Sequence, residues 1–212
     1  MRIVTWNCCR GDVEQKLAAV RSLNPDVLLL QETKPAARDG GAHYLAYLDG
    51  IGIATYTFNG HSVSSVREHE NRCGLTVTVG DVDVVNVWTH PLKRYVDSAL
   101  AVIRATDPDR PTIFAGDFNA NAIFGRGYDQ LIEELRTRST RSAYHEFHGA
   151  DHGSELHPTH YWRWQEASPF HLDYCFVPKS FAVTNVEVGS FVDWKRLSDH
   201  RPLAVDMVPA SR

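Results

Sequence analysis

The sequence lacks the cysteine pattern of a disulfide-bonded or zinc-finger protein. Only four of its 212 residues are cysteines, at positions 8, 9, 73 and 175, and no two of them have Cys-x-x-Cys spacing. Because two are adjacent and the others lie far apart, the sequence indicates neither a disulfide framework nor a cysteine-bound metal. We therefore expect reduced thiols and a cytoplasmic protein.

Long apolar segments are also missing. The sequence has no run of about 18 consecutive apolar residues, and it does not begin with a basic stretch followed by a long apolar one. We therefore expect neither a membrane association nor an export signal. No repeat, low-complexity tract or Gly/Ser linker divides the chain, and its 43% hydrophobic content is enough for one core, so residues 1–212 are expected to form a single domain.

Positive charge is not in excess. The 22 Lys and Arg residues are outnumbered by 26 Asp and Glu residues, which gives a formal net charge of -4. Proteins that coat nucleic acid without sequence preference depend on many Lys and Arg contacts to phosphate, so the composition disfavours that class. An enzyme that engages a few phosphates through a metal ion stays compatible with this balance.

The first part of the chain alternates between β-forming and amphipathic segments. Residues 2–7 are rich in β-formers and end at Asn7, which predicts a strand. Asp12 is a typical helix N-cap before an apolar helical face. Residues 26–30 form a continuous apolar run, typical of a strand buried on both faces, and are expected to deliver Glu32 into a loop. Strand, helix and strand in this order predict a layered α/β arrangement.

The rest of the chain continues this pattern with more strands and helices. Gly80-Asp81 predicts a tight hairpin turn between two alternating β-branched segments. The region 143–164 is irregular and rich in His and aromatic residues. Further strands are expected at residues 50–58, 73–79, 82–88, 112–119, 170–177, 183–191 and 201–205, and further helices at residues 96–104 and 128–135.

Residues 111–119, Pro-Thr-Ile-Phe-Ala-Gly-Asp-Phe-Asn, are typical of a buried strand that ends in polar side chains. Asp117 and Asn119 share a face through the two-residue period of a strand. Taken alone, Gly-Asp-Phe-Asn would favour a turn, because Gly, Asp and Asn are the commonest turn formers. Other apolar segments end in the same way, however, and open sheets place their chemistry at strand ends. The residues at these ends are Asn7, Glu32, His90, Asp117, Asn119, Asp173, Asp199 and His200.

Three of these residues have the oxygen ligands that Mg²⁺ prefers, namely Asn7, Glu32 and Asp199. This ion takes one or two carboxylates and leaves part of its shell to water and substrate phosphate. The Asn7 side chain could instead only bond to its own turn. These residues together are expected to hold Mg²⁺ or Mn²⁺.

The others can handle protons and water. His200 can accept or donate a proton near neutral pH if a carboxylate such as Asp173 fixes its tautomer. Asp117 and Asn119 can orient an attacking water and stabilise charge on phosphorus. The combination predicts metal-assisted hydrolysis of a phosphodiester or phosphomonoester.

Five short motifs, in this order, resemble those of a known family. They are Thr5-Trp6-Asn7, Leu30-Gln31-Glu32-Thr33, Gly116-Asp117-Phe118-Asn119, His171-Leu172-Asp173-Tyr174 and Ser198-Asp199-His200. The chain resembles the endonuclease/exonuclease/phosphatase superfamily, which includes DNase I and exonuclease III-type nucleases. The resemblance implies an α/β, four-layered α/β/β/α sandwich in which two mixed β-sheets pack together.

The resemblance also implies roles for individual residues. It places a metal at Glu32, with Asn7 and Asp199 close to it, and it makes His200 and Asp173 an acid/base pair. Asp117 and Asn119 would surround the nucleophile and the phosphate. His90 corresponds to a His that aids the leaving group in DNase I-like members, whereas Lys34 is typical of the exonuclease III-like branch, so the branch markers conflict.

We expect a Mg²⁺- or Mn²⁺-dependent nuclease acting on DNA or RNA. A phosphatase or phosphodiesterase for a small or lipid-derived phosphoester is the alternative within the enzyme class. A catalytically silent binding module with the same fold is the alternative outside it.

The His-rich segment allows two interpretations. Zinc binding would start from His145 and His148, which have i, i+3 spacing, but no cysteine supports it. A substrate-contacting loop is preferred, because Trp162 offers a stacking surface and Arg163 a cationic donor. His171 shares a face with Asp173 and is predicted either to contact substrate or to be an ordinary buried histidine.

Overall fold

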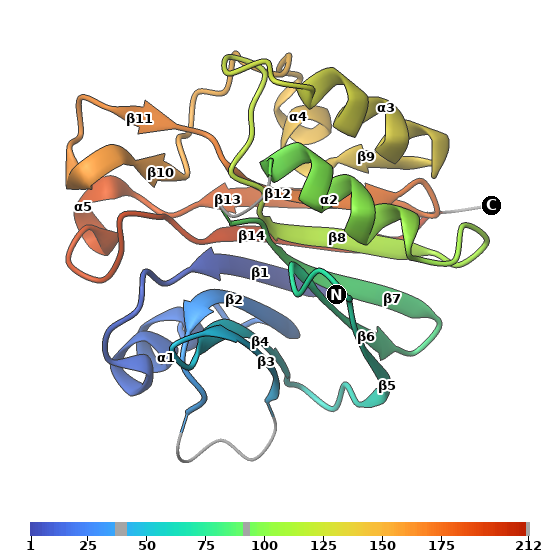
Figure 1. Ribbon diagram of the computed structural model, residues 1–212, viewed down its shortest axis with the longest axis horizontal. Helices are drawn as coiled ribbons and strands as arrows, with labels where there is room; N and C mark the ends of the chain where they lie inside the picture. The colour runs from blue at the N-terminus through green and yellow to red at the C-terminus, as the bar shows by residue number, and fades with distance from the viewer. Residues whose placement is uncertain (37–41, 91–93, 211–212) are drawn as a thin grey trace.

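Two six-stranded sheets form the centre of the computed structural model, which describes residues 1–36, 42–90 and 94–210 (Figure 1). The first sheet has the order β13-β14-β1-β2-β4-β3 and the second the order β5-β6-β7-β8-β12-β9. In the first sheet the strands are β1 (Arg2–Asn7), β2 (Val27–Thr33), β3 (His43–Leu48), β4 (Ile51–Thr57), β13 (Phe181–Val188) and β14 (Leu203–Pro209). In the second they are β5 (Val63–Glu68), β6 (Gly74–Val79), β7 (Val82–Trp88), β8 (Thr112–Asp117), β9 (Thr140–Ser142) and β12 (Asp173–Pro178).

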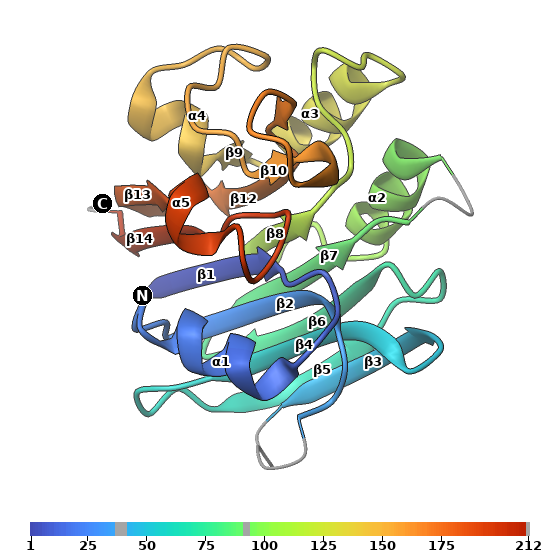
Figure 2. The ribbon, with the colours of Figure 1, turned by 90° about the vertical axis from the view of Figure 1, so that its left-hand side faces the viewer.

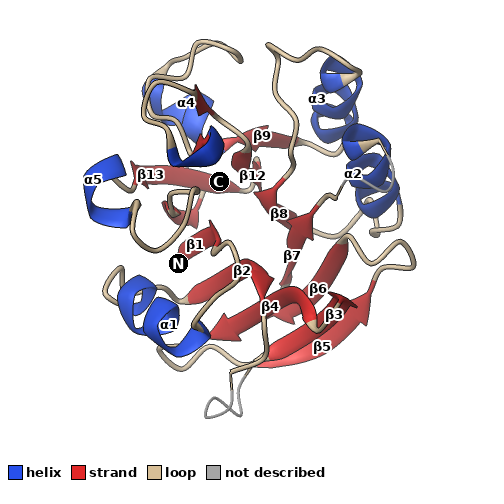
Figure 3. Ribbon diagram, turned by 60° about the vertical axis from the view of Figure 1, so that its left-hand side comes forward, coloured by secondary structure: helices blue, strands red, loops and turns tan. Residues whose placement is uncertain are grey.

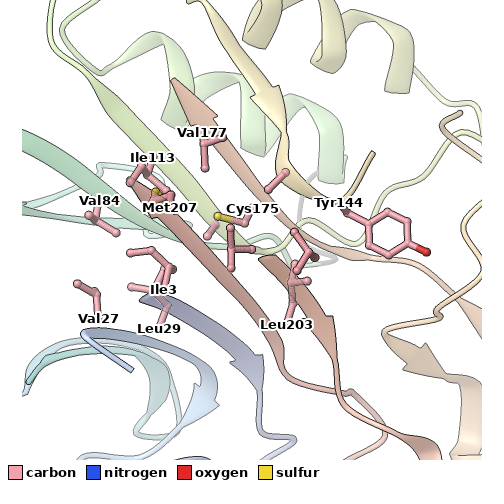
Figure 4. Packing of buried hydrophobic residues seen from close by; sticks show 14 of the residues in the cluster. Ile3, Val27, Leu29, Val84, Ile113, Tyr144, Cys175, Val177, Leu203 and Met207 are labelled. Atoms are coloured by element: carbon pink, nitrogen blue, oxygen red, sulfur yellow. The ribbon is translucent and has the colours of Figure 1, made fainter. Parts of the chain in front are cut away.

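Both sheets are mixed, since β1 pairs in parallel with β2, and β7 with β8, while the other pairings are antiparallel. The core between the sheets follows from the two-residue period of their strands. Ile3 and Leu29 of the first sheet and Ile113 and Cys175 of the second belong to one cluster of buried side chains (Figure 4).

Helices cover the outer faces of the two sheets (Figure 3). The alternate strand positions, such as Val4 and Trp6, pack against α1 (Val13–Arg21) and against Trp194 of α5 (Phe191–Trp194). The outer face of the second sheet packs against α2 (Tyr95–Arg104) and α3 (Tyr128–Thr137). The expected four-layered α/β/β/α sandwich is therefore confirmed.

The segment after residue 30 differs from the expectation of a loop. Gln31 and Glu32 belong to β2, and a register shift against β4 between Leu30 and Thr33 accompanies a φ of 51° at Glu32. The Gln31 side chain is buried and donates to Asn86 Oδ1 at 2.7 Å. The amide NH2 group of this buried polar residue is thus bonded to the facing sheet, whereas its Oε1 has no hydrogen-bond partner among the described residues.

Further differences concern short elements. The strand expected at residues 170–177 is divided into β11 (Pro169–Phe170), which pairs with β10 (His160–Tyr161), and β12. The irregular region contains α4 (Ala143–His148) and a 3-10 turn, Trp162–Trp164. The strands β3, β5 and β9 were not predicted, because they are partly exposed or short and lack a clear apolar alternation. None of the helices in the described part of the chain has the length and apolar character to cross a bilayer.

Candidate active site

The predicted strand-end residues come from both sheets. Asn7 ends β1, Asp117 ends β8, and Asp173 begins β12, where the antiparallel register places it opposite Asp117. His200 precedes β14, which pairs with β1. Figure 2 is turned so that the side of the molecule on which β1 ends faces the viewer.

The Asp117 carboxylate is the centre of a hydrogen-bond network. It accepts from the Asn119 backbone N–H at 2.9 Å, from Asn119 Nδ2 at 2.8 Å and from Asn7 Nδ2 at 2.9 Å. The turn depends on Gly116, which has a φ of 147° and lies so close to the neighbouring strand that a Cβ would be 1.9 Å from Val87 O. Asp117 is therefore held in one orientation by its neighbours.

Asn7 joins this network to Glu32. Its Nδ2 also donates to Glu32 Oε1 at 3.2 Å, whereas its Oδ1 accepts from Cys9 N at 3.0 Å. In this arrangement the amide oxygen, which would be the metal ligand predicted from the sequence, is engaged by the backbone. The contacts give Asn7 the position of a residue that orients the carboxylates of Glu32 and Asp117.

His200 and Asp173 form a second buried pair. His200 Nδ1 lies 2.8 Å from Asp173 Oδ2, as the sequence suggested. The Thr159 hydroxyl accepts from the backbone N–H of Asp173 at 3.0 Å, and the Ser198 hydroxyl accepts from His200 N at 2.9 Å. Asp173 Oδ1 is buried and has no hydrogen-bond partner among the described residues. The pair leaves His200 Nε2 as the ring atom that is available to a ligand.

Burial and mutual charge shift the pKa values of these groups. Burial raises the pKa of the Asp117 carboxyl to about 7, an effect that positive charge on His200 opposes and negative charge on Asp173 reinforces. Burial by itself would lower the pKa of His200, but the carboxylates of Asp173 and Asp117 outweigh it and raise that pKa to about 10. The His200 ring is therefore held as a cation beside its carboxylate partners.

These side chains meet at a cleft of about 870 Å³. Six of the residues predicted from the sequence line it, and the other lining residues include two arginines and three aromatics. The predicted residues are Glu32, Asp117, Asn119, Trp162, Asp199 and His200, and the additional ones include Arg94, Tyr95, Phe124, Arg126, His160 and Phe170. Trp162, which was predicted to contact substrate, lies in the wall of this cleft and is 55% exposed.

Most of the wall residues were missed because they lie in loops or at the beginning of elements. Arg94 directly precedes α2, and Arg126 has a φ of 50° in the segment before α3. His160 is the exception, since it belonged to the His-rich segment and could have been proposed. Its ring lies 4.5 Å from that of His200, centroid to centroid, and its Nε2 is 3.9 Å from Asp199 Oδ2.

Two of the predicted histidines lie elsewhere. The His90 ring stacks on Tyr47 at a centroid distance of 3.6 Å, and its Nε2 is 3.3 Å from Cys73 Sγ. His171 Nδ1 lies 2.9 Å from the backbone oxygen of His157. Neither ring lines the cleft as described. The structure therefore does not bring His90 and His171 together with the other predicted site residues.

Two predicted cations also lie outside the cleft lining. Arg163 is exposed, and its guanidinium lies 5.8 Å from the ring centroid of Trp162, so it reaches the cleft wall only through that neighbour. Lys34 is exposed just after β2. Arg94 and Arg126 take the place in the cleft that the sequence suggested for these two cations.

The sequence has no significant match among curated proteins. Among solved structures, it is similar to the 3' phosphatase NExo from Neisseria bound to a product DNA hairpin, with a TM-score of 0.77 and 18% identity over 98% of this chain and 99% of that one. A second similar structure is the 3'-5' exonuclease NExo from Neisseria meningitidis, with a TM-score of 0.75 and 19% identity over 97% of this chain and 99% of that one.

An endonuclease/exonuclease/phosphatase from Beutenbergia cavernae gives a TM-score of 0.72 and 20% identity over 100% of this chain and 72% of that one. At these identities the likeness shows a shared fold. The family model described as Endonuclease/Exonuclease/phosphatase family matches residues 4–200 of the sequence. With nearly the whole chain matched, the protein belongs to the endonuclease/exonuclease/phosphatase family.

Proposed function

We propose that the protein is a divalent-metal-dependent phosphoesterase that cleaves nucleic acid, with DNA as the first substrate to test. One observation supports this most directly. The His200–Asp173 pair and the hydrogen-bonded Asp117 meet in one cleft whose walls carry two arginines and four aromatic rings. Acidic and basic groups at the centre, with cationic and stacking groups around them, suit a phosphate linked to bases.

The donor set fits Mg²⁺ or Mn²⁺. Glu32 and Asp199 both line the cleft and supply the carboxylate oxygens that a hard cation takes. Asn7 Nδ2 donates a hydrogen bond to Glu32 Oε1 and so orients the Glu32 carboxylate. When bound, such an ion would neutralise negative charge on the phosphate and lower the pKa of a water molecule. We propose Glu32 and Asp199 as its ligands and Asn7 as the residue that orients Glu32.

The chain's own residues then divide the remaining tasks. Asp117, held by Asn7 and Asn119, orients the attacking water and accepts its proton. The His200 cation stabilises the charge that develops on the phosphate oxygens, and Asp173 keeps the ring in position through Nδ1. Arg94 and Arg126 bind flanking phosphates, and Trp162 stacks on a base.

The test is a substrate panel with matched variants. Plasmid, single-stranded DNA, RNA and a 3'-phosphorylated oligonucleotide would be incubated with Mg²⁺ or Mn²⁺, and separately with EDTA. We expect cleavage that EDTA abolishes and that Asp117→Ala and His200→Ala reduce by about 100-fold or more. Glu133→Gln, on the exposed surface of α3, is the control and should retain activity. The proposal would be contradicted if none of these substrates is cleaved. It would also be contradicted if Asp117→Ala and His200→Ala are as active as the original chain.

A small phosphoester is the second candidate, and the charge balance favours it. The formal net charge is -4, and only two arginines of the described residues line the cleft. A nucleoside monophosphate and oligonucleotides of increasing length would be compared by kcat/KM. A value that rises with length supports the nucleic-acid assignment, whereas a value that is highest for the mononucleotide supports the small substrate.

A further inference from the structure

A second cluster of possible metal ligands lies outside the cleft, between α4 and the segment 149–159. His145, His152 and Glu155 have ligand atoms that all lie within 4.8 Å of one another. His145 Nε2 is 3.0 Å from Glu155 Oε1, and the rings of His145 and His152 stack at a centroid distance of 3.6 Å. The side chains of His145 and Glu155 are only 8% and 4% exposed. Two imidazoles and a carboxylate buried side by side are costly unless a bound ligand or hydrogen bonds replace the contacts that they would make with water.

Neighbouring groups fix the orientation of all three side chains. Ser142 Oγ lies 2.7 Å from His145 Nδ1, and the Tyr128 hydroxyl lies 2.8 Å from His152 Nδ1. The backbone N–H of Gly153 donates to Glu155 Oε1 at 3.1 Å. Histidines that bind metals are usually held in this way by a contact at the other ring nitrogen. The contacts at Nδ1 leave Nε2 as the coordinating atom of each ring, and at His145 the ion would replace the proton that Nε2 shares with Glu155 Oε1.

We propose that His145, His152 and Glu155 bind a Zn²⁺ ion that is separate from the catalytic metal. Two imidazole nitrogens and one carboxylate form a donor set that zinc accepts in tetrahedral geometry. With bonds of about 2.0–2.2 Å in tetrahedral geometry, neighbouring ligand atoms of such an ion lie roughly 3.4 Å apart. Because an imidazole binds a metal in the plane of its ring, the stacked rings of His145 and His152 would turn so that both point to the ion.

His171 is the candidate for the fourth ligand. Its Nε2 is buried and has no hydrogen-bond partner among the described residues, and its ring centroid lies 6.1 Å from that of His145. The sequence suggested His148 instead, but His148 is exposed, and its ring lies 4.5 Å from that of Tyr144. The metal-binding partners of His145 thus lie further along the chain than the i, i+3 spacing indicated.

The position of the cluster gives the ion a structural task. It would join α4 to the segment that leads to Thr159, whose hydroxyl accepts from the backbone N–H of Asp173. Zinc would therefore stabilise the segment around Thr159, which holds Asp173 in place beside His200, without touching the substrate.

Zinc binding to the full chain tests the proposal. Metal-free protein would be titrated with Zn²⁺ against a chromophoric chelator, in excess Mg²⁺ to occupy the hard-cation site. We expect one tightly bound Zn²⁺, which Glu155→Gln and His152→Ala weaken roughly tenfold or more. His148→Ala is the matched control on the same helix and should bind zinc as tightly as the original chain.

Thermal unfolding gives a second readout that does not depend on activity. Zn²⁺ should raise the Tm of the original chain and of His148→Ala, because a ligand that binds only the folded state stabilises it. It should raise the Tm of Glu155→Gln, which keeps the size of the side chain, much less. The proposal is overturned if the original chain binds no zinc, or if it binds zinc no more tightly than Glu155→Gln and His152→Ala do.

Discussion

At the scale of single residues, the buried carboxylate of Asp173 determines the orientation and the charge of His200. Its carboxylate is fully buried and lies 2.8 Å from His200 Nδ1, while two backbone N–H groups, those of Leu172 and Asp173 itself, donate to the Thr159 hydroxyl. The geometry is fixed by the backbone, so a change at the Asp173 side chain can alter charge with little change in shape.

Asp173→Asn should therefore lower kcat much more than it raises KM. The amide has the same size as the carboxylate but cannot stabilise a cationic His200, and we expect kcat to fall by about 100-fold or more. Steady-state kinetics on the best substrate of the panel measures both constants. A kcat within about threefold of the original would show that the pair is not needed for catalysis.

His69 provides a residue-scale prediction about stability. Its ring is buried, with Nε2 2.8 Å from Thr76 Oγ1, and burial lowers its pKa from 6.5 to about 4. Between these two values the unfolded chain binds a proton that the folded chain does not. The free energy of unfolding should therefore fall as the pH drops from about 6.5 towards about 4, and should not depend on His69 above that range.

Urea unfolding at about pH 7 and about pH 5 would measure this effect. In His69→Gln the loss of stability between the two pH values should be smaller than in the original chain by about 2 kcal/mol. Burial of other histidines also contributes to acid sensitivity, so the difference between the two proteins is the relevant quantity. Identical losses in both would refute the assignment.

The residues at strand ends were predictable, whereas most of those in the cleft walls, with the exception of Trp162, were not. Asp117 and Asn119 follow an apolar run and a glycine, a local pattern that the sequence displays directly. Arg94 and Arg126 have no such pattern, because they lie directly before α2 and in the segment before α3, outside any apolar run. His90 also ends a predicted strand, but its ring packs against Tyr47 and Cys73, outside the lining of the cleft.

At the scale of elements, the 3-10 turn Trp162–Trp164 offers an internal comparison. Its two tryptophans are both exposed, but only Trp162 lines the cleft as described. The turn follows β10, whose His160 ring lies 4.5 Å from that of His200, centroid to centroid. This part of the cleft wall therefore lies beside the His200–Asp173 pair.

Trp162→Ala should weaken binding of single-stranded DNA by about 1–3 kcal/mol, because a base loses its stacking surface. Trp164→Ala removes the same side chain two residues further along and should leave binding unchanged. Fluorescence anisotropy with labelled oligonucleotide and a chelator, which prevents turnover, measures both. Equal effects in the two variants would place the nucleic acid outside this cleft.

Element types were predicted best where apolar periodicity was strong. The hairpin of β6 and β7 and the helix α2 lie within one residue of their expected bounds. The strand β5 is largely exposed and reads as polar, so its place at the sheet edge depends on pairing with β6. The division of β11 from β12 depends on the hairpin with β10, a contact that no local pattern specifies.

At the scale of the whole molecule, the first sheet is closed by strands from opposite ends of the described chain. β14 lies between β13 and β1, and Arg2 is paired in register with Asp206. The terminal amine of Met1 donates to Met207 O at 2.8 Å. Leu203, Val205 and Met207 of β14 contribute to the core between the sheets.

A chain that stops at residue 202 should fail to fold cooperatively. It would lose β14, expose the edges of β1 and β13, and remove three fully buried side chains from the core. A chain that stops at residue 210 keeps the strand and is the control. Near-ultraviolet circular dichroism and resistance to proteolysis would distinguish them, and a native-like spectrum for the shorter chain would contradict the expectation.

The position of β14 also has a consequence for synthesis on the ribosome. The strands β5, β6, β7 and β8 follow one another in the chain and in the second sheet, so they can pair while translation continues. β1 can pair with β2 early, but its other edge stays open until β14, which lies far along the chain, has been synthesised. During that interval the nascent chain presents one unpaired strand edge, and we expect the first sheet to be completed only after β5–β8 have paired.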